Sequence, residues 1–174
     1  MKIRTEQLLA VMNVLAWVTF IGLMIKAGAI LISYGVSIAN PEAAKNLYRG
    51  MDLYKLRQFS FWHYTSMVSF EVALAALEAY IAYLVIKVLS KIKLTNPFTI
   101  GISNMLEKLS YFILGTWVTV MLYNAHTKWL LKRIDGLQEN LISGEFIFLA
   151  GVVFVIAQIF KRGVEIQSEN ELTI

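Results

Sequence analysis

The chain has 174 residues, of which 57% are apolar and only 16% are charged, and its mean hydropathy is +0.60. Soluble domains carry about 45–50% apolar and about 25% charged residues, so this composition excludes an ordinary soluble domain. The absence of cysteine excludes disulfide scaffolds, thiolate metal sites and cysteine nucleophiles. We therefore expect a small integral membrane protein.

Four apolar segments are predicted to cross the bilayer, whose hydrocarbon layer of roughly 30 Å needs about 20 mainly apolar residues in a helix. The first three cover residues 8–32, 65–89 and 109–131. The fourth covers residues 142–160, because its continuously apolar part starts only at Phe146 and is too short without the residues before it. The sequence therefore predicts an all-α membrane protein, a four-transmembrane-helix bundle in a single domain.

The amino-terminal segment could also be read as a secretory signal, since Lys2 and Arg4 precede an apolar run and residues 37–39 resemble a cleavage site. The apolar part of a signal is only about 7–15 residues long, so we expect an uncleaved membrane anchor instead. Four spans place both termini on one side. With cytoplasmic termini, eight lysines and arginines fall inside and seven outside. Because the inner ones crowd the helix ends, we expect a cytoplasmic membrane protein with both termini cytoplasmic.

The connection between the first two spans carries a helix start. Asn40 is the expected N-cap, and Pro41 fills the first helical position. Apolar residues then recur at roughly helical spacing, namely Leu47, Tyr48, Met51, Tyr54 and Leu56. We expect one short interfacial helix here, which lies on the membrane surface or caps the bundle.

Ionisable residues inside the spans are informative, because a charge at the centre of a span costs about 2.5–3.5 kcal/mol on insertion scales. Lys26 lies 18 residues after Leu8, and Glu71 lies 18 residues before Leu89. With about 1.5 Å of rise per residue, the two side chains lie at similar depth. The sequence therefore predicts a Lys26–Glu71 ion pair between the first two spans.

Glu78 lies on the same helical face as Glu71 but nearer the middle of the bilayer. The sequence offers no equally deep cation, so we expect Glu78 to be protonated or to bond to Thr19, Gln158 or water. The predicted intramembrane polar cluster also extends toward the outer mouth and the fourth span. Its members are Lys26, Glu71, Glu78, His126, Glu145 and Gln158.

Two interpretations of this cluster stay open. In the first, buried polar pairs only fix the register of the helices. In the second, the cluster forms a proton or ion pathway or a pocket for a small ligand, because ionisable groups inside a membrane are usually functional.

The sequence lacks the common motifs of nucleotide binding, hydrolysis and metal catalysis. The chain carries no nucleotide-binding loop, no GxSxG elbow and no HExxH motif, and His63 and His126 have no neighbours at metal-ligand spacing. We expect no enzyme activity, no metal and no cofactor. The net charge of +4 favours lipid head groups over nucleic acid as a partner. Gly22, Gly28 and Gly151 leave a homo-oligomer open.

Residues 90–107 join the second and third spans, with a turn signal at residues 95–97 and an expected N-cap at Ser103 or Asn104. The composition turns polar over residues 161–174, where Gly163 is expected to end or bend the fourth helix. This tail is either a frayed, solvated end or a docking segment for a cytoplasmic partner. Its expected docking residues are Gly163, Glu165, Asn170, Glu171 and Leu172.

Three stretches together resemble a known family: the tripeptide Asn96, Pro97 and Phe98, the helix opening NMLEKLSYF at 104–112, and the ending QIFKRGVEIQSENELTI. The family comprises bacterial four-helix membrane proteins and is catalogued as domain of unknown function 2975. Its members usually end in Asn-Asp-Leu-Thr-Ile/Val, whereas this chain has Glu171 in place of the aspartate. The resemblance implies four spans in a bacterial cytoplasmic membrane, termini inside and no catalytic residues.

Genes of this family are often found beside small helix-turn-helix regulators, so the resemblance implies a DNA-binding protein as partner. We therefore expect a non-enzymatic membrane protein that acts by partner interaction or by sensing stress on the envelope. A small transporter or channel lined by Lys26, Glu71 and Glu78 is the alternative.

Overall fold

The computed structural model describes residues 2–92 and 98–171. These residues form six helices and no strands. In chain order the helices are α1 (Lys2–Ala39), η1 (Pro41–Asn46), α2 (Tyr54–Phe59), α3 (Phe61–Lys91), α4 (Ile100–Leu131) and α5 (Phe146–Glu171). Among them, α1, α3, α4 and α5 are long and apolar enough to cross a membrane. The predicted all-α fold with four spans is confirmed.

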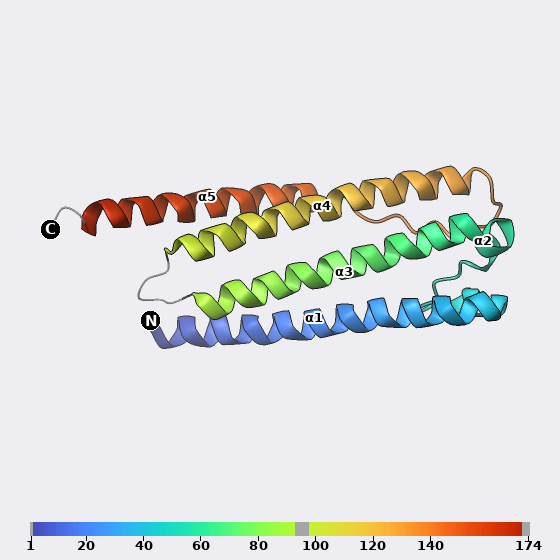
Figure 1. Ribbon diagram of the computed structural model, residues 1–174, viewed down its shortest axis with the longest axis horizontal. Coiled ribbons are helices and arrows are strands. Elements are labelled where there is room, and N and C mark those ends of the chain that lie inside the picture. Colours follow the sequence, from blue (N-terminus) through green and yellow to red (C-terminus); the bar gives the residue numbers. More distant parts are fainter. Residues whose placement is uncertain (1, 93–97, 172–174) are drawn as a thin grey trace.

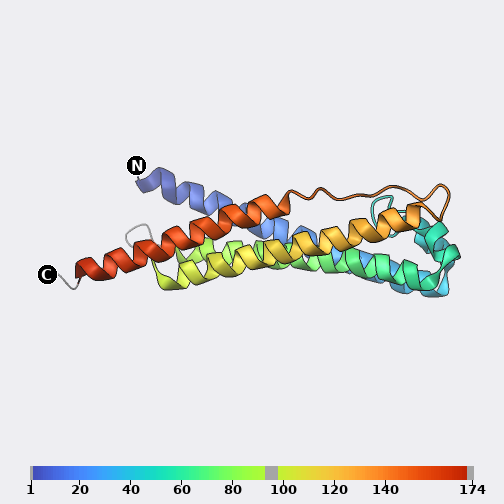
Figure 2. The same cartoon turned by 90° about the horizontal axis from the view of Figure 1, so that it is seen from above.

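The four long helices form an open row rather than a closed bundle (Figure 1). Helix α1 packs on α3, α3 packs on α4, and α4 packs on α5. Within the described residues, no Cα atom of α1 comes within 8 Å of a Cα atom of α5. Figure 2 shows that the first half of α1 also diverges from α3 toward its amino terminus. The two outer helices therefore expose most of their apolar surface.

The two ends of the row differ in their connections. At one end, which we name the capped end, η1 and α2 link α1 to α3, and α4 turns into the segment that leads to α5 (Figure 1). The start of α1, the end of α3, the start of α4 and the end of α5 lie at the other end, which we name the terminal end. This placement follows from four antiparallel crossings.

The helices are longer than the predicted spans at several ends. Helix α1 has 38 residues and α3 has 31, which corresponds to about 57 and 46 Å of helix and exceeds the hydrocarbon layer. Helix α4 starts at Ile100, because the Thr99 hydroxyl accepts a hydrogen bond from the backbone N–H of Ile102 at 3.3 Å. The predicted N-cap at Ser103 or Asn104 is therefore wrong. Ser103 is a buried helical residue, and its hydroxyl donates to the carbonyl of Ala157 at 3.1 Å.

The start of α5 also differs from the prediction. The helix begins at Phe146, and Ile142 lies in a non-helical segment that runs back along α4 (Figure 2). The side-chain amide of Asn124 holds this segment, since it donates to the Ile142 carbonyl at 2.8 Å and accepts from the Ile142 N–H at 3.0 Å. Backbone without helical hydrogen bonds needs such partners near a membrane. The predicted helical extension to Ile142 is therefore wrong.

The other end of α5 corrects a second expectation. The helix continues through Gly163 to Glu171, so Gly163 neither ends the helix nor marks the start of a frayed tail. Asn96 and Pro97, the first two residues of the tripeptide, lie outside the described residues.

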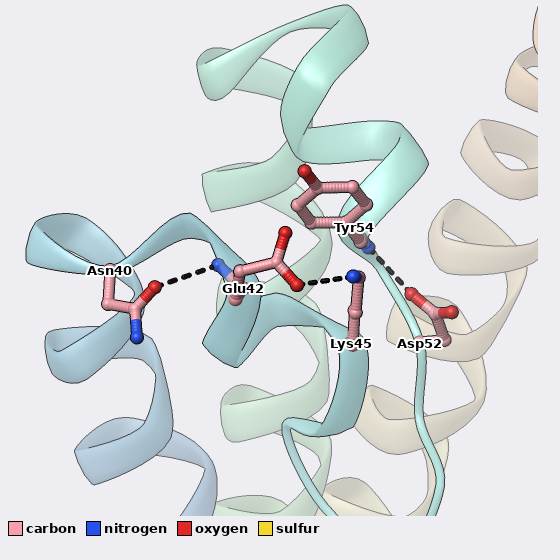
Figure 3. A network of polar contacts seen from close by, with 5 residues as sticks. All are labelled: Asn40, Glu42, Lys45, Asp52 and Tyr54. Carbon is pink, nitrogen blue, oxygen red and sulfur yellow. Dashed lines mark hydrogen bonds and ion pairs between the residues drawn. The ribbon is translucent and has the colours of Figure 1, made fainter.

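The capped end contains two short helices where the sequence predicted one (Figure 3). Asn40 is the N-cap as predicted, because its side-chain oxygen accepts from the N–H of Glu42 at 3.1 Å. The 3-10 helix η1 then ends in a turn where Arg49 and Gly50 have positive φ angles of 48° and 87°. Left-handed backbone cannot continue a right-handed helix, so the apolar residues that follow form a separate helix, α2.

These short helices cap the bundle. Leu47, Leu53 and Leu56 are buried and belong to the larger of the two apolar cores. Polar side chains face away from that core: Lys45 forms an ion pair with Glu42, and Asp52 accepts from the N–H of Tyr54 at 2.9 Å (Figure 3). Of the two positions left open by the sequence, the structure selects the cap.

Candidate functional site

The predicted Lys26–Glu71 ion pair is present between α1 and α3. The Nζ atom of Lys26 lies 3.9 Å from Oε2 of Glu71, and the two side chains are 29% and 9% exposed. Glu71 reaches this place because α3 turns its face of Glu71, Ala75 and Ala82 inward, where all three are buried. The pair therefore joins two helices inside the predicted hydrocarbon layer.

A third helix contributes to the same layer. Tyr123 on α4 is buried and lies close to Glu71 and to Thr127. Thr127 is also buried, and its hydroxyl lies 3.9 Å from the sulfur of Met67 on α3. Lys26, Glu71 and Tyr123 thus form a polar layer across α1, α3 and α4. A carboxylate that meets a cation on one side and a hydroxyl on the other is well compensated in a medium of low polarity.

Glu78 lies two turns further along α3, on the same face as Glu71, and is half-buried. Its carboxyl forms no hydrogen bond and no ion pair with the described residues, although Lys26 and Glu71 both lie close enough to influence its charge. Lys26 carries one positive charge and the two glutamates carry two negative charges when ionised. With Lys26 already paired with Glu71, Glu78 is left without a cation of its own.

Glu78 opens into a groove of about 540 Å³ between α1 and α5, with α3 and α4 beneath it. We name it the Glu78 groove. Its walls are apolar apart from Glu78 and Thr19, and the Thr19 hydroxyl donates within α1 to the carbonyl of Leu15 at 2.9 Å. The lining residues from the four helices include Met12, Leu15, Leu23, Val85, Ile113 and Leu149. The groove exists because α1 and α5 do not meet.

The structure does not bring the remaining cluster residues to this place. Gln158 is exposed on α5, because that helix packs on α4 through Ala150 and Ala157, and Gln158 lies about 100° further round the helix than Ala157. Glu145 is also exposed, and it accepts a hydrogen bond from the hydroxyl of Ser143 at 2.9 Å. The expected bond between Glu78 and Gln158 is absent from the described residues.

His126 lies at the capped end, where it is paired with His63. The Nδ1 atom of His63 is 3.2 Å from Nε2 of His126, and the Ser66 hydroxyl is 3.4 Å from Nδ1 of His126. The ring of Trp129 lies 5.0 Å from that of His63. In such a pair one imidazole donates a hydrogen bond and the other accepts it.

The sequence-based reasoning missed this histidine pair, although a signal was present. Helices α3 and α4 are antiparallel neighbours, so each step forward along α3 is matched by a step backward along α4. The contacts of Phe70 with Tyr123 and of Met67 with Thr127 follow this rule, and the rule places His63 opposite residues 130–131, about one helical turn from His126. The described residues hold no group of three or more acidic, histidine or cysteine side chains that could bind a metal ion.

The tail is joined to the α3–α4 connection by an aromatic contact. The rings of Phe98 and Phe160 lie 5.2 Å apart. At Gly163, a Cβ atom would lie only 2.6 Å from Cδ1 of Phe98, so glycine lets the ring pack directly on the helix. Glu165 is exposed and forms an ion pair with Arg162 at 2.7 Å. The side chains of Asn170 and Glu171, and all of Leu172, lie outside the described part of the chain.

A comparison with protein families finds one match. The model of the family described as "Protein of unknown function (DUF2975)" matches residues 39–174, and the chain belongs to this family. No curated protein matches the chain, and no solved structure matches it. Membership agrees with the resemblance seen in the tail and in the α3–α4 connection, and it assigns no activity.

Proposed function

We propose that this member of a family without an assigned activity is a non-enzymatic, multi-pass membrane protein that acts by binding a second protein at its terminal end. One observation carries the proposal: α5 does not stop where its apolar segment stops, but continues as a helix to Glu171. Both views show the last turns of α5 extending beyond the ends of α1, α3 and α4 (Figures 1 and 2). A helix that leaves the bundle offers a surface to a partner.

The chemistry of this surface supports a protein partner. Lys161, Arg162, Glu165 and Glu169 are exposed on the protruding helix and mix both signs of charge. Ile166 is 47% exposed among them. Charged groups around an exposed apolar side chain are common at interfaces between proteins. Phe98 fixes the base of this helix against the α3–α4 connection, so the surface has a defined position.

The proposed partner is a small cytoplasmic helix-turn-helix regulator, as the family resemblance implies, and the proposed stimulus is stress on the envelope. This requires the terminal end to lie in the cytoplasm and the chain to reside in the bacterial cytoplasmic membrane. Both are part of the proposal. A membrane protein of this kind would hold the regulator away from DNA until the stimulus releases it.

Co-purification from membranes tests the proposal. The full chain is expected to retain a helix-turn-helix regulator encoded in the same genome, and Ile166→Asp is expected to lose it. Gln138→Ala, a change of an exposed residue at the capped end, is the matched control and should retain the regulator. Equal retention by the Ile166 variant, or no retention by the unaltered chain, would contradict the proposal.

A transporter or channel is the second candidate, and the carboxyl group of Glu78, which has no ion-pair partner among the described residues, favours it. Ionisable groups inside a membrane often mark substrate or ion pathways. Flux into proteoliposomes should then fall when Glu78 is changed to Gln and should persist in Glu139→Gln, an exposed carboxylate in the segment before α5. Flux that is unchanged by Glu78→Gln would count against transport.

A further inference from the structure

We propose that the Glu78 groove binds a lipophilic cation, an amphiphile with one protonated amine and a single apolar tail, and that Glu78 is its counter-ion. The proposal concerns binding only. It requires neither the protein partner at the terminal end nor movement of the ligand across the membrane, so it can hold or fail independently of both candidate functions.

The charges of the polar layer give the first argument. Lys26 is the cation nearest to both glutamates, and it is placed at 3.9 Å from Glu71. Tyr123 also lies close to Glu71, whereas Glu78 has no hydrogen-bond or ion-pair partner among the described residues. An unpaired carboxylate in hydrocarbon is costly until a proton or a cation joins it. The site is therefore complementary to one added positive charge.

The walls of the groove decide which kind of cation fits. An inorganic cation such as Ca²⁺ needs about 6–8 oxygen ligands, and the groove offers Glu78 and Thr19 as its only polar side chains. An ammonium group needs fewer partners, since it has at most three N–H donors. It can donate to the Glu78 carboxylate, and a primary or secondary ammonium has a further N–H for the remaining lone pair of the Thr19 hydroxyl. The rest of its surface would contact apolar side chains.

The size of the groove suits an amphiphile. Its volume of about 540 Å³ lies within the range of roughly 300–1,000 Å³ that is typical of small-molecule sites. On α1 the lining runs from Met12 to Leu23, which corresponds to about 16 Å along the helix. A long apolar tail can lie along this wall while the amine remains at Glu78.

The open row provides the route of entry. The amino-terminal half of α1 diverges from its neighbours, and α5 does not close the gap (Figure 2). The groove therefore opens sideways toward the acyl chains. An amphiphile that already partitions into the bilayer reaches Glu78 without crossing a polar surface, whereas a strongly hydrated ion does not. Entry from the lipid thus favours the same class of ligand as the lining does.

The test uses the purified full chain in nanodiscs of zwitterionic lipid, with N,N-dimethyldodecylamine as the cationic probe and dodecanol as the neutral control. Dicyclohexylcarbodiimide, which modifies carboxyl groups in apolar surroundings, reports whether Glu78 is free, and mass spectrometry locates the label. A tertiary amine forms no stable amide with the activated carboxyl, and any ester that dodecanol forms with it is counted as modified Glu78 in the mass spectrum. At a probe concentration about ten times its dissociation constant, labelling of Glu78 is expected to fall about tenfold, whereas dodecanol should leave it unchanged.

Thermal unfolding provides the second measurement. The amine is expected to raise the melting temperature of the unaltered chain and of Glu139→Gln, but not that of Glu78→Gln. Should Glu78→Gln fail to fold, Glu78→Asp retains the charge and should still be stabilised by the amine at higher concentration. Equal protection by dodecanol, absence of any label at Glu78, or full labelling in saturating amine would each overturn the proposal.

Discussion

At the capped end, α1, α3 and α4 share one buried core with η1 and α2, and polar side chains join them across the interfaces. At the terminal end, α1 leaves the other helices and α5 packs on α4 alone. Ser37 and Tyr64, for example, are fully buried at the capped end with their hydroxyl oxygens 2.6 Å apart. On the same helix as Ser37 but toward the terminal end, Leu15 is 55% exposed.

This difference shows that one sequence can build a rigid half and an accessible half within the same long helices. The capped end contains the hydrogen bonds between Tyr34 and Thr65 and between His63 and His126. The polar layer of Lys26 and Glu71 lies at the border, and Glu78 lies just beyond it. We infer that the capped end holds the helices in register, so that the open half can receive a ligand without loss of the fold.

The largest expected effect comes from the core of the capped end. Leu56 is fully buried, so Leu56→Ala should lower the free energy of unfolding by about 2–5 kcal/mol. Leu15→Ala, at an exposed position of the open half, should change it by no more than about 0.5 kcal/mol. Reversible unfolding in mixed micelles measures both. Equal losses would mean that the two halves are packed alike.

The ion pair at the border should have the next largest effect. Glu71→Gln leaves Lys26 without its partner, and we expect a loss of about 1–3 kcal/mol, reduced from the value for fully buried pairs because Lys26 is 29% exposed. Lys26→Met and the double variant complete a mutant cycle. A coupling energy of at least about 0.5 kcal/mol is expected. Purely additive effects would show that the two side chains do not interact.

The position of this pair illustrates what the sequence could predict. The depth of a residue in a span follows from a fixed rise per residue, and neighbouring spans are antiparallel, so Lys26 and Glu71 could be matched by counting. The row of helices could not be predicted in this way. A row of polar or small residues along one face of a helix indicates that this face contacts a neighbour, but it does not indicate which helix the neighbour is. Gln158 was therefore assigned to the polar cluster in the interior, although it is exposed on α5.

The boundaries of the helices were harder still to predict. The side chains that set a boundary are either distant in sequence from it or of a type that is common elsewhere in the chain. Asn124 on α4 binds the backbone of Ile142 just before α5. At the start of α4, Thr99 rather than Ser103 accepts the hydrogen bond that caps the helix. The split between η1 and α2 depends on left-handed backbone at Arg49, a residue that rarely adopts it. Gly50 was the residue in the sequence that could have indicated this break between the two short helices.

A smaller effect is expected where Phe98 packs on α5. Replacing a helical glycine with alanine usually adds up to about 1 kcal/mol of stability. At Gly163 the new Cβ would lie 2.6 Å from the ring of Phe98, so we expect Gly163→Ala to destabilise the unaltered chain by about 1 kcal/mol. In a Phe98→Ala background the same change should be stabilising. Unfolding of the four variants measures this reversal, and the same sign in both backgrounds would argue against the contact.

The smallest effect concerns pH at the capped end. The hydrogen bond and the ion pair with Lys45 lower the pKa of Glu42, which is exposed on η1. Because the pKa of Glu42 in the folded state is below the ordinary glutamate pKa, the pair stabilises the folded state at any pH above that ordinary pKa. This stabilisation is lost as the pH falls through the pKa of the folded state. The difference in melting temperature between the unaltered chain and Glu42→Gln should therefore shrink between about pH 5 and pH 3. A difference that is constant with pH would exclude this linkage.

Disulfide trapping in membranes tests the open row most directly, because the natural chain contains no cysteine. A disulfide needs Cα atoms about 4.4–6.8 Å apart, and no Cα atom of α1 lies within 8 Å of one in α5 among the described residues. Ser103→Cys with Ala157→Cys, where the short serine side chain reaches the facing backbone carbonyl at 3.1 Å, should cross-link rapidly, and Leu15→Cys with Leu149→Cys should not. Rapid cross-linking of Leu15→Cys with Leu149→Cys would show that α1 and α5 meet and that the Glu78 groove does not exist.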